Sequence, residues 1–157
     1  MKFFSLAMLC SLPVCAQTLH PIEVQPAPNG RNGALSIELL QAEGKEPVAL
    51  QWEFSFPESV QLDFKGASTE EAAAKAQKAI RCELLASRQG KTQTVRCILA
   101  GGTAAIPGGP IANLKFGGAR PFRPGRYEVQ IKKAIAVMPD LKKVALKDAR
   151  VEITISK

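Results

Sequence analysis

The strongest constraint on this chain is a pair of short alternating segments that carry one cysteine each. Residues 80–87 and 93–99 flank a glycine-containing turn at 88–91. An antiparallel register with Cys82 opposite Cys97 also pairs apolar residues on one face and opposite charges on the other. These pairs are Ile80 with Leu99, Leu84 with Val95, and Glu83 with Arg96. The two segments therefore predict a hairpin linked by a Cys82–Cys97 disulfide.

The loop length of this hairpin determines the type of cysteine pair. A four-residue loop at 88–91 makes the two cysteines a non-hydrogen-bonded pair, in which side chains approach most closely, whereas a two-residue Gln89-Gly90 turn does not. We therefore favour the longer loop over the two-residue turn.

Residues 1–16 have the pattern of a secretory signal peptide. Lys2 supplies a positive start, residues 3–12 form an apolar run, and small residues lead to a cleavage point after Ala16. The run is about half of the roughly 20 apolar residues that a membrane span requires, and no later segment qualifies. We expect a soluble, exported mature chain from Gln17, located in the periplasm, at the cell surface or outside the cell.

The cysteine count supports this interpretation. Cleavage after Ala16 would remove Cys10 and Cys15 and leave only Cys82 and Cys97. An even number of cysteines in an exported chain favours a disulfide over a metal site or free thiols. A lipoprotein signal ending at Cys15 is a weaker alternative, because the residue before a lipid-modified cysteine is normally small and here it is valine.

Short segments that alternate apolar and polar residues recur along the chain. In the clearest, residues 50–56, Leu50, Trp52, Phe54 and Phe56 share one face. Each segment is typical of a strand with one buried and one wet face. The others are residues 60–64, 111–116, 127–131 and 151–155. With turns between them and no long amphipathic helix, they predict an all-β antiparallel sandwich.

The chain is expected to contain one domain. Residues 17–33 hold three prolines and two Asn-Gly steps, a composition that suits a leading edge strand and a loop. Residues 34–157 carry the remaining strands without internal repeats or low-complexity tracts. Their length is sufficient for a real hydrophobic core.

Two local features interrupt the strand pattern. Residues 68–78 are alanine-rich, and Ser68 with Glu71 resembles a capping box, so one short surface helix is predicted. Strict alternation after Tyr127 would turn Lys133 toward the core. A β-bulge at Lys132 and Lys133 avoids this, and after such a bulge either set of alternate residues can face the core. The buried face would resume with Ala134 and Ala136, or with Ile135 and Val137.

Several segments, taken in order, resemble the bacterial cohesin-like domain, a jelly-roll sandwich related to the families 2 and 3 carbohydrate-binding modules. These segments are residues 48–57, 74–82, 96–99, 106–116 and 124–129. The resemblance implies a non-catalytic binding module. Cohesins of cellulosome scaffolds bind calcium-loaded dockerins, but this chain has only one such domain. Its basic, apolar loop at 138–143 also lacks the oxygen ligands that calcium requires.

The sequence predicts no catalytic residue, no cofactor and no metal site. His20 lies beside Pro21 near the expected mature N-terminus, where a held catalytic partner is not expected. Glu70 and Glu71 are adjacent and would point apart on a helix, where their expected role is to favour the positive end of the helix dipole. No serine lies in a nucleophile-elbow context.

Charge is distributed unevenly along the mature chain. Residues 17–114 carry nine Lys/Arg and ten Asp/Glu, whereas residues 115–157 carry eleven and four. The basic third could attract an anionic glycan, a lipid headgroup or an acidic protein, or it could simply be a set of solvated strand edges and loops. Eight of its eleven basic residues are candidates for such a patch: Arg120, Arg123, Arg126, Lys132, Lys133, Lys142, Lys143 and Lys147.

Within this basic third, we selected five residues as candidate ligand contacts. They are Arg120, Phe122, Arg123, Arg126 and Lys132. Phe122 is the aromatic residue best placed for surface contact, because Trp52 and Tyr127 lie on apolar strand faces and are expected in the core. Nucleic acid is disfavoured by export. Recognition of a protein or cell-surface partner is the leading hypothesis, and polysaccharide binding, possibly of acidic glycans, is the alternative.

Overall fold

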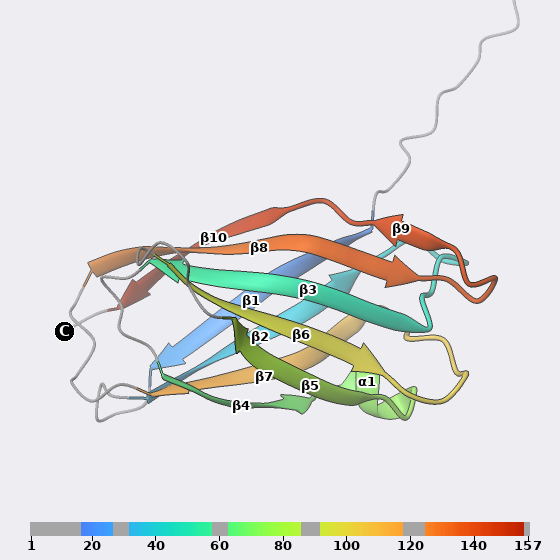
Figure 1. The fold of residues 1–157 in the computed structure, drawn as a ribbon, viewed down its shortest axis with the longest axis horizontal. Coiled ribbons are helices and arrows are strands. Elements are labelled where there is room, and N and C mark those ends of the chain that lie inside the picture. Colours follow the sequence, from blue (N-terminus) through green and yellow to red (C-terminus); the bar gives the residue numbers. More distant parts are fainter. Residues whose placement is uncertain (1–16, 27–31, 58–62, 86–91, 118–124, 156–157) are drawn as a thin grey trace, which may run out of the picture.

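The computed structural model describes residues 17–26, 32–57, 63–85, 92–117 and 125–155. They form two antiparallel sheets packed face to face (Figure 1). Sheet A has the strand order β1-β2-β7-β4, with β1 (Thr18–Pro26), β2 (Asn32–Leu40), β4 (Asp63–Thr69) and β7 (Gly109–Gly117). The fold is therefore the all-β antiparallel sandwich that the alternating segments predict.

Sheet B has the order β10-β8-β3-β6-β5, and β9 pairs with the far end of β8. Its strands are β3 (Ala49–Pro57), β5 (Ala79–Leu85), β6 (Thr92–Ala100), β8 (Gly125–Val137), β9 (Lys143–Ala145) and β10 (Ala149–Ile155). No helix in the described ranges has the length and hydropathy needed to cross a bilayer.

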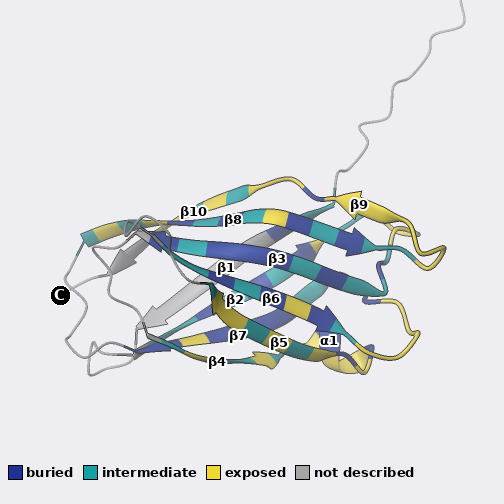
Figure 2. Cartoon of the chain, in the orientation of Figure 1, coloured by how far each residue is buried: buried dark blue, intermediate teal, exposed yellow. Residues whose placement is uncertain are grey.

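The core fills the space between the two sheets (Figure 2). Leu50, Trp52 and Phe54 of β3 are at most 1% exposed, so the alternation of this strand directs one face inward as predicted. Opposite them, β2 and β7 of sheet A contribute Leu35, Ile37, Leu39, Ile111, Leu114 and Phe116. Trp52 is a core residue, and Tyr127 packs against the core while half-buried.

The cysteine hairpin forms in the predicted register. Cys82 of β5 lies opposite Cys97 of β6, and the two are joined by a disulfide with a Cα–Cα distance of 4.1 Å. That spacing corresponds to a non-hydrogen-bonded pair, for which about 4.5 Å is usual. The predicted pairs Ile80 with Leu99, Leu84 with Val95, and Glu83 with Arg96 are all present. The favoured four-residue loop at 88–91 lies outside the described residues.

The predicted bulge in β8 is present. Glu53 of β3 pairs with Lys132 and Gln51 pairs with Ile135, so β8 has one extra residue between them. Lys133 takes a left-handed φ of 50° there, and its amide donates to Asp148 Oδ1 at 3.3 Å. After the bulge, the buried face resumes with Ala134 and Ala136. This is the first of the two outcomes that the sequence left open.

The predicted helix over residues 68–78 is largely wrong. The helix α1 covers only Glu71–Lys75, and its N-cap residue Glu70 makes no side-chain capping bond. Ser68 belongs instead to β4 and pairs with Asn113 of β7, so strand pairing overrides the capping-box pattern. The helix also buries two alanines and is not purely superficial.

Candidate functional site

The structure describes two of the five candidate contact residues. Arg126 lies on β8 with its side chain 76% exposed, and its Nη1 is 3.4 Å from Glu152 Oε1 on β10. Lys132 lies on the same strand, directly opposite Glu53. Six residues of β8 separate the two, about 20 Å at roughly 3.3 Å per residue. Arg120, Phe122 and Arg123 lie outside the described residues.

The other described basic residues of the last third are spread over both sheets, with Lys115 on β7 of sheet A and Arg150 on β10 of sheet B. Lys133 occupies the bulge of β8, whereas Lys142 and Lys143 lie at the turn into β9, and Lys147 follows β9. Arg126 is at the opposite end of β8 from this turn. The described basic residues therefore do not converge on one patch.

A row of charged side chains crosses the middle of the surface that sheet B turns away from sheet A. We call this surface the outer face of sheet B. It comprises Ala79, Arg81, Glu83, Thr94, Arg96, Ile98, Ala100, Gln51, Glu53, Ser55, Gln130, Lys132, Ile135 and Val137, together with the bulged Lys133.

Glu53 is the centre of this charged row. Arg96 donates to Glu53 Oε1 through Nη2 at 2.8 Å and through Nε at 3.2 Å. Lys133 Nζ lies 3.0 Å from Glu53 Oε2, and Arg96 Nη1 lies 3.8 Å from Glu83 Oε1. The Glu53 side chain is only 6% exposed although its strand position faces outward. The arginine and the lysine therefore bind both carboxylate oxygens of a nearly buried group.

The pKa of Glu53 reflects this environment. Burial alone would raise it, but the hydrogen bonds and positive charges of Arg96 and Lys133 together outweigh burial and hold the pKa below its ordinary value. Glu53 is therefore ionised at neutral pH, and the three side chains form a fixed network.

A row of mainly apolar residues, which we call the apolar row, lies beside the charged row and ends on β5 at Arg81, the cross-strand partner of Ile98. Ile98 of β6, Gln51 of β3, Ile135 of β8 and Ala145 of β9 are aligned across four strands. Ile98 is 44% exposed although it belongs to a strand whose alternate residues are in the core. Adjacent rows on one face are about 7 Å apart, so a partner resting on the outer face can touch both rows.

Sequence reasoning selected neither Glu53 nor Ile98. The signal for both was available, because Glu53, Arg96 and Ile98 all occupy outward positions of alternating segments. What was missing was the neighbour relation of β3 and β6, which are far apart along the chain and become adjacent only in the sheet.

Neither a protein-family model nor a curated protein sequence matches this chain. Its structure, however, superposes on solved structures. A cohesin module from a family 33 glycoside hydrolase of Clostridium perfringens gives a TM-score of 0.64 at 10% identity, over 88% of this chain and 96% of that one. The chain has a cohesin-like fold.

Two further neighbours show the same fold. The sixth cohesin of scaffoldin B from Acetivibrio cellulolyticus, solved in complex with a mutant Cel5 dockerin, has a TM-score of 0.63 and 12% identity, over 90% of this chain and 98% of that one. A non-cellulosomal cohesin from Archaeoglobus fulgidus has a TM-score of 0.58 and 10% identity, with coverages of 88% and 92%. The resemblance to cohesins stated from the sequence is confirmed for the fold.

The other sheet of this cohesin-like fold carries a small polar cluster. Glu70 accepts a hydrogen bond from Ser36 Oγ at 2.7 Å and one from Asn113 Nδ2 at 3.2 Å. Glu70 therefore links β2 and β7 from its N-cap position, and Glu71 lies in the first turn of the helix, where the expected effect on the helix dipole stays a prediction.

The described residues of the cohesin-like domain assemble no metal-binding cluster. No set of three or more histidine, cysteine, aspartate or glutamate side chains there could hold a metal ion. His20 lies in β1, and its side chain is outside the described part of the chain.

The Glu53 network predicts a pH effect on stability. Because the pKa of Glu53 is lowered in the folded state, its contribution is present above the ordinary carboxyl pKa and is lost as the pH falls through that value toward the folded-state pKa. We expect the unfolding free energy of Glu53→Gln to depend less on pH than that of the wild type below about pH 4.5. Urea titrations at a series of acidic pH values measure this difference.

Glu71→Gln is the matched control for this prediction. The pKa of Glu71 is also lowered, by its hydrogen bond with Lys75, but its side chain is 70% exposed. Solvent screens such exposed pairs, so this variant should follow the wild-type curve closely. A Glu53→Gln curve parallel to the wild type would show that folding does not lower the pKa of Glu53.

Proposed function

We propose that this chain is an exported, non-catalytic binding module that recognises a protein partner through the outer face of sheet B. The observation that carries the proposal is the pair of adjacent rows on that face. One row is a nearly buried ion-pair network around Glu53, and the other exposes Ile98 on a regular sheet surface.

The two rows can serve different purposes in recognition. The apolar row offers surface whose burial drives association. The charged row is already held in place by its own hydrogen bonds, so little side-chain entropy is lost when a partner docks on it. Charges in fixed positions also reject partners with the wrong charge pattern.

The likeness to known structures supports a protein as the partner. The Acetivibrio cellulolyticus cohesin was solved with a dockerin bound, and this chain shares its fold. The described residues give less support to polysaccharide binding, because Trp52 is in the core and the exposed large apolar side chains there are all aliphatic. Sugar platforms use exposed aromatic rings.

Export rests on two features of the chain. Residues 1–16 have the pattern of a signal peptide, and the Cys82–Cys97 disulfide is of the kind that persists in oxidising compartments. Intact mass of the exported protein should correspond to a chain that begins at Gln17.

The proposed face is tested by capture with immobilised protein covering residues 17–157. Envelope and secretome of the producing organism are applied at low and high salt to the wild type, Ile98→Asp and Leu40→Asp. Leu40 is the matched control, because it is 43% exposed on a strand of sheet A and Ile98 is 44% exposed on sheet B.

We expect the wild type and Leu40→Asp to retain the same protein at both salt concentrations. Ile98→Asp should weaken its affinity at least about tenfold, because a desolvated carboxylate in an apolar contact costs more than 1.4 kcal/mol. Retention of glycan instead of protein, or equal retention by Ile98→Asp, would reject the proposed function.

A further inference from the structure

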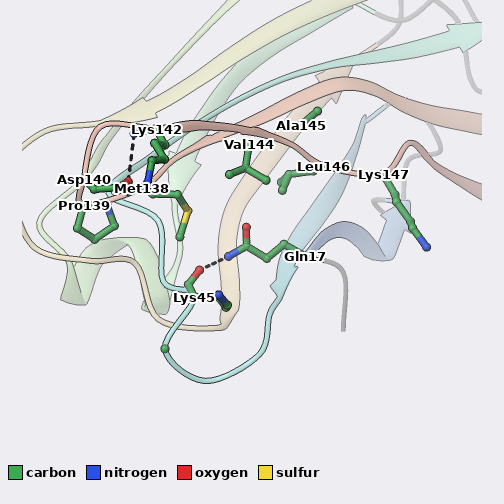
Figure 3. Close-up of a pocket in the computed structure, with 11 residues that line it drawn as sticks. Gln17, Lys45, Met138, Pro139, Asp140, Lys142, Val144, Ala145, Leu146 and Lys147 are labelled. Atoms are coloured by element: carbon green, nitrogen blue, oxygen red, sulfur yellow. Dashed lines mark hydrogen bonds and ion pairs between the residues drawn. The ribbon is translucent and has the colours of Figure 1, made fainter. Parts of the chain in front are cut away.

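A groove of about 660 Å³ opens at the end of the sandwich where β8 turns into β9 (Figure 3). Its floor is formed by Met138, Val144 and Leu146. Gln17 and Lys45 form the opposite wall, where the Gln17 amide donates a hydrogen bond to the carbonyl oxygen of Lys45. This groove lies at the edge of the sandwich and shares only Ala145 with the rows described on the outer face of sheet B.

The floor of the groove continues the hydrophobic core to the surface. Leu146 is 7% exposed and belongs to the core, and Met138 packs against it while half-buried. Val144 is 41% exposed. Figure 3 shows the side chains of Val144 and Leu146 on the side of the strand that faces Gln17. An apolar side chain of a ligand would therefore find a preformed apolar surface.

One wall of the groove is a strand edge with free backbone groups. Met138 N donates to Lys142 O at 2.9 Å and Leu146 N donates to Ala134 O at 2.8 Å, which fixes the antiparallel ladder between β8 and β9. In this ladder Val144 directs its backbone N–H and C=O toward β8. Lys143 and Ala145 must direct theirs the other way, and no described strand pairs with them.

This free edge faces the groove. Just beyond β9, Lys147 forms an isolated parallel bridge with Thr18 on the side away from β8. Gln17, the residue before Thr18, lines the groove. Among the described residues, β1 therefore pairs with this edge at Lys147 and none pairs with it along β9, where a strand can be added.

The charge of the groove is positive. Lys45, Lys142 and Lys147 line it, and Asp140 is the one acidic residue among the lining residues. Asp140 lies 2.7 Å from Lys142 Nζ. Within the described part of the chain, Lys45 and Lys147 have no acidic partner, so two ammonium groups are available to a carboxylate-bearing ligand.

We propose that this groove binds an extended acidic peptide segment of a partner protein. The segment adds as a strand to the free edge of β9, one apolar side chain enters the groove above Val144, and a carboxylate meets Lys45 and Lys147. Strand addition uses backbone hydrogen bonds for affinity and alternate side chains for selectivity. The proposal is independent of the outer face of sheet B.

The test uses a capped five-residue peptide that alternates glutamate and valine. Two controls are matched to it: the same peptide with lysine in place of glutamate, and the same peptide with N-methylated valines, which cannot donate strand hydrogen bonds. Binding is followed by the amide chemical shifts of the protein covering residues 17–157. We expect saturable shifts centred on Lys143 and Ala145 for the acidic peptide only.

Variants separate this site from the outer face of sheet B. Val144→Asp should weaken peptide binding at least about tenfold, whereas Ile98→Asp should leave it unchanged. Both residues are exposed to a similar degree, 41% and 44%, so neither substitution enters the core. Unchanged capture of the protein partner by Val144→Asp would confirm that the two sites are separate.

Three results would overturn the proposal. They are equal binding of the N-methylated peptide, no saturable shift with the acidic peptide at millimolar concentration, and shifts of the same amides with decanoate but not with peptide. The last result would assign the groove to an acyl chain, and the second would leave the edge of β9 without a strand partner.

Discussion

Phe54→Ala is expected to lower the free energy of unfolding by about 3–5 kcal/mol, the usual range for removing a buried phenylalanine. Phe54 is fully buried. Its ring centroid lies 5.4 Å from that of Phe56, 6.3 Å from Phe64 and 5.8 Å from Phe116. Two of these partners belong to sheet A, so the substitution opens a cavity between the sheets.

Urea unfolding followed by far-ultraviolet circular dichroism measures this effect. Phe64→Ala is the control, because Phe64 belongs to the same aromatic cluster but is only partly buried. It should therefore cost clearly less than Phe54→Ala. A loss below about 1 kcal/mol for Phe54→Ala would show that this cluster does not hold the sheets together, and equal losses for the two variants would show that burial does not set the cost of each ring.

Removal of the disulfide is expected to cost about 3 kcal/mol, the amount predicted for closing a loop of roughly 15 residues in the unfolded chain. Cys97 is fully buried beside Trp52, and Cys82 is half-buried on the edge strand β5. The domain should remain folded, because its core does not depend on the cross-link alone.

The double variant Cys82→Ala/Cys97→Ala tests this without leaving a free thiol. Its unfolding curve should not change with reductant, whereas the wild-type curve should shift toward it when reduced. Alkylation of the mature wild-type protein without reduction should add no mass. Labelling of both cysteines under those conditions would remove the cross-link from the account of stability.

The local pattern of the chain predicted much of the fold correctly. Alternation identified the segments that became β3, β7, β8 and β10, since a change of face at every residue is specific to a strand. The hairpin register could be predicted because its two cysteines lie only 15 residues apart, with a single turn between them, and share their register with the paired charges. The bulge could be predicted because strict alternation would have turned the charged side chain of Lys133 toward the core.

The site was less predictable. A row such as Glu53, Arg96 and Lys133 comes from three strands that are far apart along the chain, and only the strand order of sheet B makes them neighbours. The wrong prediction of a helix over residues 68–78 also has a tertiary cause. Ser68 and Glu71 satisfy a capping box locally, but pairing of Ser68 with Asn113 is a tertiary contact that outcompetes it.

The sequence by itself determined that the segments which became β3, β5, β6, β7, β8 and β10 form strands, and how the cysteines pair. These features depend on local periodicity and short-range register. The tertiary structure alone decided which strands lie side by side. This arrangement places the nearly buried Glu53 in contact with Arg96 and Lys133. It also lets the Lys78 ammonium group donate to the carbonyl oxygens of Gly101 and Gly102, and it leaves β9 with β8 as its only partner among the described strands. Such contacts depend on long-range packing, which local patterns do not encode.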